Sequence, residues 1–203
     1  MLIDFKRKFV FVHVAKTAGT AIESAIGSMC DLSVTFPAKY GTLERACEIK
    51  KFLLPNWEDF KSFAVVRNPW QHVHSDYHHC KRMVNVAPKN TEFHVKCLKA
   101  QKQTFAQFVY AQMLPLNGGG VFGYYANDND GQCLVNRVIR FETLQEEWLP
   151  LLEWLNLPPT PLVPKNVNHS KPSDWKAEYT DELIACVAEG CAKDIERFGY
   201  TAP

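Results

Sequence analysis

The sequence predicts an α/β protein, a three-layer fold in which helices flank a central parallel sheet. Two continuous β-branched and aromatic runs, at residues 9–14 and 63–66, are typical of strands buried on both faces of a parallel sheet. Helical spacing of apolar residues alternates with these runs, and residues 135–141 form a third strand candidate. Ligands of such folds bind beyond the carboxyl ends of the strands. The segments that follow the first two strands are therefore expected to carry the site.

The other elements follow from apolar spacing and from helix-ending residues. The length of 203 residues fits a single domain spanning 1–203. Residues 84–104 are polar and irregular, and are either a substrate-facing insertion or a surface loop, while 116–130 are rich in Gly, Asn and Asp and predict a loop. Gly199 is expected to close the last helix. The predicted helices lie at 21–29, 42–54, 69–83, 105–113, 142–155 and 179–198.

Composition and charge limit the possible partners. Lys and Arg total 23 against 22 Asp and Glu, and this net charge of +1 gives no global attraction to nucleic acid or to an anionic membrane. No stretch approaches the roughly 20 apolar residues of a membrane helix. Seven cysteines, an odd number without metal-type spacing, favour free thiols in a reducing compartment. We expect a cytoplasmic protein with neither a nucleic-acid nor a membrane partner; the pattern does not indicate an oligomeric state.

Histidines are concentrated in the helix expected after Pro69. A metal site needs ligands on one helix face, and either His74 with His78 or His72 with His79 meets that requirement. No carboxylate or cysteine completes a ligand set at a recognisable spacing. The sequence therefore predicts a solvated or substrate-facing helix and no metal site.

The first motif is a tight loop between the first strand and the helix after it. Backbone N–H groups at the start of a helix lack partners and, with the helix dipole, favour a phosphate. Gly19 permits close approach of the backbone, Thr17 and Thr20 offer hydroxyl groups, and Lys16 supplies a charge. An ordinary strand-to-helix turn would account for this segment equally well. The lysine begins the loop, whereas a kinase-type phosphate loop ends with it, which speaks against a kinase or NTPase.

The second motif begins where the second strand ends. Arg67 leaves that strand, and Ser75 follows eight residues later, two turns into the next helix. The planar guanidinium suits phosphate oxygens, and the serine adds a neutral donor. We expect Arg67 and Ser75 to hold one anion.

The order of the two motifs resembles the PAPS-dependent sulfotransferases, in particular the carbohydrate-type and bacterial branch; PAPS is 3′-phosphoadenosine-5′-phosphosulfate. The resemblance spans nearly the whole chain and is most specific in its first two stretches. The matching stretches are Phe-Val-His-Val-Ala-Lys-Thr-Ala-Gly-Thr at 11–20, Phe-Ala-Val-Val-Arg-Asn-Pro-Trp at 63–70 through 75–77, and 140–144, 168–170 and 194–200.

The resemblance implies a P-loop-like fold and an O-sulfotransferase that moves the sulfuryl group of PAPS to an acceptor hydroxyl, with adenosine 3′,5′-bisphosphate as product. The acceptor is a sugar or a small alcohol or phenol. Lys16 would stabilise the leaving oxygen, and Arg67 and Ser75 would hold the 3′-phosphate. The alternative is a non-catalytic or kinase-like P-loop nucleotide-binding protein. The residues implied in cofactor binding are Lys16, Thr17, Ala18, Gly19, Thr20, Arg67 and Ser75, together with Ser170 and Lys171 on a polar loop that we expect to cover the nucleotide.

The general base does not follow from the resemblance. Ala15 replaces a proline that the family often carries, and the catalytic histidine that some relatives have upstream of the second strand is missing. Glu23 lies three residues after Thr20, close to the expected phosphosulfate, and is the preferred base. His78 and His79 are its rivals, because imidazole has the better intrinsic pKa.

Overall fold

The computed structural model describes residues 1–30, 45–53, 56–164 and 174–203. Contacts between Cα atoms group the chain into two compact units, one formed by 1–36, 43–67 and 125–167 and the other by 37–42, 68–124 and 168–203. The prediction of one domain, 1–203, is not tested by this grouping. Among the described residues, no helix is long and apolar enough to cross a membrane.

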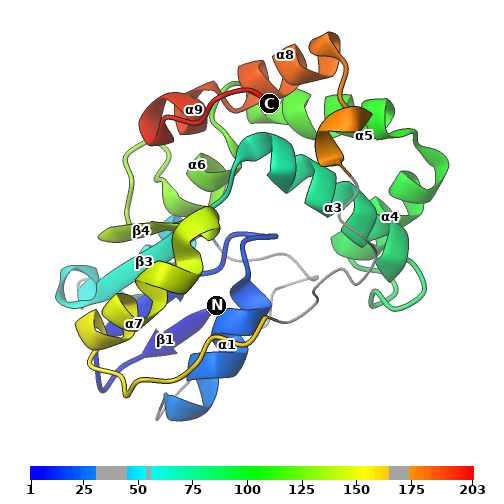
Figure 1. Cartoon of the computed structure of the whole chain (residues 1–203). Coiled ribbons are helices and arrows are strands. Elements are labelled where there is room, and N and C mark those ends of the chain that lie inside the picture. Colours follow the sequence, from blue (N-terminus) through cyan, green and yellow to red (C-terminus); the bar gives the residue numbers. More distant parts are fainter. Residues whose placement is uncertain (31–44, 54–55, 165–173) are drawn as a thin grey trace. The chain divides into compact units, whose positions relative to one another are not determined.

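The first unit contains a four-stranded mixed sheet with the strand order β1-β2-β3-β4 (Figure 1). Strand β2 (Phe9–Val12) pairs in parallel with β3 (Lys61–Val66), and β3 pairs in parallel with β4 (Arg137–Arg140). Strand β1 (Leu2–Asp4) pairs antiparallel with β2. The three predicted strands are confirmed and pair in parallel, and a further edge strand, which was not predicted, makes the sheet mixed. The antiparallel edge strand is only three residues long and shows no sequence alternation.

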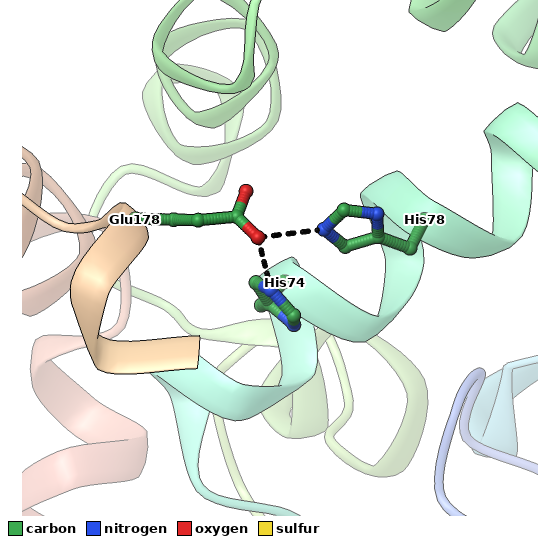
Figure 2. A group of neighbouring side chains, drawn as sticks. All are labelled: His74, His78 and Glu178. Carbon is green, nitrogen blue, oxygen red and sulfur yellow. Dashed lines mark hydrogen bonds and ion pairs between the residues drawn. The ribbon is translucent and has the colours of Figure 1, made fainter. Parts of the chain in front are cut away.

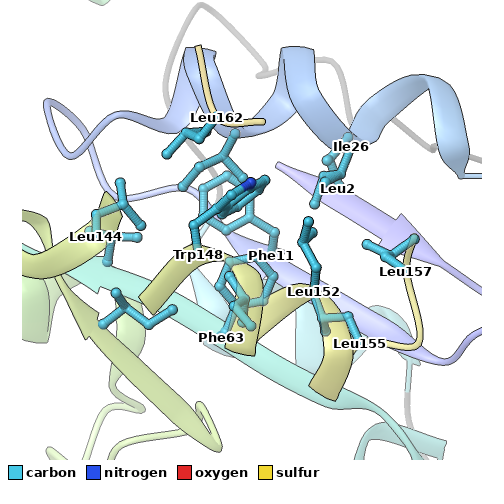
Figure 3. Packing of buried hydrophobic residues seen from close by; sticks show 14 of the residues in the cluster. Leu2, Phe11, Ile26, Phe63, Leu144, Trp148, Leu152, Leu155, Leu157 and Leu162 are labelled. Carbon is cyan, nitrogen blue, oxygen red and sulfur yellow. The ribbon is translucent and has the colours of Figure 1, made fainter. Parts of the chain in front are cut away.

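The core of the first unit lies between one face of this sheet and two helices, α1 (Gly19–Ile26) and α7 (Leu144–Trp154). Side chains alternate along a strand, so Phe9 and Phe11 face the same side as Phe63 of the neighbouring strand. The rings of Phe11 and Phe63 stack with centroids 4.8 Å apart, and Trp148 packs over them (Figure 3). The aromatic runs of the sequence are thus the buried centre of this unit.

Short helices complete the first unit. They are η1 (Gly27–Met29), α2 (Ala46–Leu53), η3 (Asn56–Asp59) and η5 (Phe141–Thr143). Of the predicted helix at 42–54, residues 42–44 and 54 lie outside the described residues.

The second unit is helical, and α3 (Pro69–Met83) forms its start. The Asn68 side chain accepts hydrogen bonds from the backbone of Trp70 and Gln71, which caps this helix, and Pro69 fits its first position. Helix α5 (Phe105–Met113) also has its predicted bounds and begins with a capping box at Thr104. The remaining elements are α4 (Glu92–Lys102), η4 (Leu114–Leu116), η6 (Trp175–Glu178), α8 (Asp181–Gly190) and α9 (Ala192–Phe198); α6 (Val121–Ala126) crosses the boundary between the units.

Three helical segments differ from the predictions. Helix α4 lies inside the polar stretch 84–104, and α6 lies inside the predicted loop 116–130. The predicted helix at 179–198 is two helices, α8 and α9, that meet at Cys191. Gly199 closes α9 in a left-handed conformation with φ of 61°, which confirms its predicted role.

Candidate functional site

The predicted phosphate loop joins β2 to α1 and has an unusual backbone. The φ angle is 60° at Lys16 and 68° at Ala18, so two residues that are not glycine adopt the left-handed region. Left-handed residues next to right-handed ones turn successive N–H groups toward one side and form an anion-binding concavity. The hydroxyl group of buried Thr17 donates to the carbonyl oxygen of Val14 at 2.8 Å, so it stabilises the loop from beneath.

The start of α1 adds further donors to this loop. The amides of Ala21 and Ile22 both bond to the carbonyl oxygen of Ala18, and no side chain of the described residues caps the helix. The amides of Gly19 and Thr20 fall in the first turn, where the helix itself provides no acceptor. Thr20 is exposed. This end of the helix therefore suits an anionic ligand.

Arg67 reaches the loop from the next strand. It follows β3, which lies beside β2, and its Nη1 atom donates to the carbonyl oxygen of Lys16 at 3.1 Å. The guanidinium lies 4.2 Å from the ring centre of Phe141, which follows β4. The structure thus brings together Lys16 and Arg67, two predicted site residues that are far apart in the sequence, and adds Phe141, which the sequence reasoning missed.

A histidine that the sequence reasoning did not select covers the same loop. His13 lies so close to Gly19 that a Cβ atom added at position 19 would be 1.8 Å from the His13 Nε2 atom. The His13 Nδ1 atom is 2.9 Å from Glu23 Oε1 on α1. His13 directly follows β2 and comes just before the predicted phosphate loop, and this position is a sequence signal that could have identified it.

Glu23 is held by two hydrogen-bond partners. It bonds to His13 and also to the Met1 amino group. Burial alone would raise the pKa of Glu23, but the hydrogen bonds and charges of His13 and of the amino group lower it to about 2. A carboxylate with so low a pKa is a weak base, which argues against the preferred assignment of Glu23.

The other predicted site residues are not part of the first unit, which contains the loop, or lie outside the described residues. Ser75 lies on α3 in the second unit, so its pairing with Arg67 stays a prediction. His78 and His79 lie on the same helix, where the Nε2 atom of His78 is 3.1 Å from Glu178 Oε1 and His79 stacks on Phe93. Ser170 and Lys171 lie outside the described residues.

Comparisons with known proteins found no match to this chain among family models, curated proteins or solved structures. The functional interpretation therefore depends on the motifs and on the geometry of the loop.

Proposed function

We propose that the protein is a PAPS-dependent O-sulfotransferase with a P-loop-like nucleotide site. The observation that carries this proposal is the loop at 16–19, which has alternating φ values, opens α1 and bonds to Arg67. Such a loop suits the 5′-phosphosulfate, since its amides converge on an anion. The order of the two sequence motifs, loop first and Arg67 on the neighbouring strand, is the order found in the sulfotransferases that the chain resembles.

In this proposal the chain neutralises charge and moves a proton. The acceptor oxygen forms a bond to sulfur while the bond from sulfur to the bridging oxygen breaks, and its electron pair stays on the 5′-phosphate of the product. Lys16 and the loop amides stabilise the charge on that leaving oxygen. Positioning and charge stabilisation dominate the related transfer of phosphoryl groups, and we expect the same for a sulfuryl group.

His13 is the base that this geometry favours over Glu23. Ionised Glu23 accepts a hydrogen bond from Nδ1–H, which leaves the Nε2 atom, the one beside Gly19, able to take the acceptor proton. Glu23 then acts as a positioning residue that orients the ring and stabilises its protonated form, as the carboxylate does in other catalytic histidine pairs.

Nucleotide binding tests the proposal most directly. Arg67→Ala should weaken binding of adenosine 3′,5′-bisphosphate by about 10- to 100-fold, since a charge-assisted contact contributes about 1.5–3 kcal/mol, and Ser75→Ala should weaken it by about fivefold. Binding of adenosine 5′-monophosphate, which lacks the 3′-phosphate, should change little. Calorimetric titration of both nucleotides gives the comparison. Arg137→Ala is the matched control, because Arg137 begins β4 and lies at the edge of the sheet opposite to Arg67.

Two outcomes would contradict the proposal. Equal weakening of both nucleotides would show that Arg67 only supports the loop through the Lys16 carbonyl group. Binding of ATP with magnesium, without binding of adenosine 3′,5′-bisphosphate, would favour the alternative of a kinase-like or non-catalytic nucleotide-binding protein.

A further inference from the structure

Three side chains of the second unit converge on one point. His74 and His78 are four residues apart on α3 and therefore project from the same face. Glu178, at the end of η6, places one carboxylate oxygen 3.0 Å from His74 Nε2 and 3.1 Å from His78 Nε2 (Figure 2). These residues form the His74–His78–Glu178 cluster.

The cluster is held by its surroundings. The hydroxyl group of Tyr179, the residue after Glu178, donates to the carbonyl oxygen of Trp70 at 2.8 Å, which fastens η6 to the first turn of α3. The indole of Trp70 in turn donates to the carbonyl oxygen of Ile184 on α8. The His74 ring packs edge-on against Phe105 with centroids 5.8 Å apart. Because both elements are fixed, the three polar atoms meet without support from a ligand.

We propose that the His74–His78–Glu178 cluster binds a divalent transition metal ion, with Zn²⁺ as the best match. The three ligand atoms lie within 4.8 Å of one another. Bonds of about 2.0–2.2 Å to nitrogen and oxygen in a tetrahedral site place ligand atoms about 3.3 Å apart. The two nitrogen–oxygen distances of 3.0 and 3.1 Å need to change by only a few tenths of an ångström, and the nitrogen–nitrogen separation, within 4.8 Å, closes by rotation of the two rings. Two imidazoles and one carboxylate suit zinc, iron or nickel, whereas Mg²⁺ and Ca²⁺ need more oxygen ligands.

The ion replaces hydrogen bonds that the cluster makes in its absence. The Nε2 atom of each histidine must present its lone pair to the metal, so the ring proton moves to Nδ1 and no net charge change on the rings is required. Partial exposure, 13% for His74 and about one third for the other two side chains, leaves a route for the ion and for a water ligand. Three protein ligands with an open fourth position are the composition of catalytic rather than closed structural zinc sites. This inference is independent of the proposed sulfotransferase activity.

Metal titration of the full chain tests the inference. After removal of metal with a chelator, isothermal titration with ZnCl₂ should give one ion per chain. His78→Ala and Glu178→Gln should each weaken binding by at least about 100-fold, since even an outer-shell partner contributes 10- to 100-fold. His79→Ala, which removes the adjacent imidazole that stacks on Phe93, is the matched control and should bind within about twofold of the wild type.

Cobalt(II) gives a second measurement that does not depend on how the variants fold. Bound Co²⁺ in the wild type should show visible d–d absorption without the sulfur-to-metal charge transfer that any of the seven cysteines would produce. Circular dichroism checks the fold of each variant. The inference is wrong if His78→Ala and Glu178→Gln bind Zn²⁺ as well as His79→Ala does, if the wild type binds no stoichiometric ion, or if the cobalt spectrum shows thiolate ligation.

Discussion

At the scale of single residues, the loop depends on a glycine that leaves room for a neighbouring ring. An added Cβ at position 19 would overlap the His13 imidazole, so Gly19 is needed for the contact between the ring and the start of α1. The positive φ values fall instead on Lys16 and Ala18, where a side chain costs about 1–2 kcal/mol of backbone strain. Strain at two such positions is typical of a loop whose backbone amides serve a ligand.

Measurements of kcat and of nucleotide affinity should show whether Lys16 and His13 act in the transfer step or in binding. If the proposed mechanism holds, Lys16→Ala and His13→Ala should each lower kcat by about 100-fold or more, because the first variant would lose charge stabilisation at the leaving oxygen and the second would lose the base. Affinity for adenosine 3′,5′-bisphosphate should fall far less in both variants. Labelled PAPS with a panel of sugar, alcohol and phenol acceptors measures the rate.

Matched variants make this comparison specific. Lys8→Ala removes an exposed lysine that pairs with Asp59, and His79→Ala removes a rival base; both should keep near-normal kcat. A His13→Ala enzyme within tenfold of the wild type would exclude His13 as the base, and a large loss in His79→Ala would transfer that role to α3.

At the scale of elements, α6 depends on a residue that lies far away in the sequence. The carboxylate of Asp194 on α9 accepts hydrogen bonds from the amides of Phe122 and Gly123 at 2.8 and 3.1 Å, which caps the start of α6. A Cβ at Gly120 would be 2.1 Å from this carboxylate, so the glycine allows its approach. Burial raises the pKa of Asp194 to about 6, although the two amide groups partly oppose the shift.

This raised pKa predicts a pH dependence of stability. The folded state holds the Asp194 proton up to about pH 6, while the unfolded chain releases it near its ordinary pKa of 3.8, so stability falls as pH rises between these values. The loss should reach about 2–3 kcal/mol, at 1.36 kcal/mol per pKa unit. Asp194→Asn has no carboxyl group to titrate, so its unfolding free energy lacks this component.

Urea unfolding at pH 4, 5, 6 and 7 measures the effect. The unfolding free energy of the wild type minus that of Asp194→Asn should decrease by about 2–3 kcal/mol across this range, because other titrating groups cancel in the difference. Asp130→Asn, at an exposed turn position, should show no such trend. A wild-type difference independent of pH would mean that the carboxyl group is not desolvated as the structure indicates.

Local signals predicted the elements that carry their own caps and apolar faces. Strands β2 and β3 are continuous apolar runs, and α3 and α5 begin at Asn68 and Thr104, which cap them. The helices that were missed have weaker local signals or depend on a distant partner. Helix α4 has a local cap at Thr91, but the residues it buries, Cys97 and Ala100, are small and give no strong apolar pattern. Helix α6 depends on Asp194.

The candidate site was likewise predictable only in part. Arg67 directly follows β3, and Lys16 lies in the loop that follows the neighbouring strand β2, so the parallel pairing of these strands places both segments at the same edge of the sheet. His13 was missed because its role depends on the ring lying over Gly19 and on its bond to Glu23, neither of which has a sequence spacing of its own. Glu178 was missed for a similar reason, since it approaches His74 from about a hundred residues further along the chain.

At the scale of the whole molecule, neither unit is a continuous piece of chain. Residues 68–124 leave the first unit after β3 and return to it before β4, and residues 168–203 belong again to the second unit. If the second unit unfolded alone, 68–124 would become a flexible loop between two paired strands, and closing so long a loop costs conformational entropy. Chain connectivity therefore couples the unfolding of the two units.

We therefore expect one cooperative unfolding transition. The calorimetric and van't Hoff enthalpies should agree, as for a single two-state domain. Ile139→Val in the first core and Val109→Ala in the second, both at fully buried positions, should each lower the same midpoint, by about 2–4 °C for every kcal/mol lost in a chain of this size. Differential scanning calorimetry of the wild type and both variants gives the comparison, and Val163→Ala, at an exposed position, is the control. Two transitions, each shifted by only one of the core variants, would show that the units unfold separately and that the prediction of one domain is wrong.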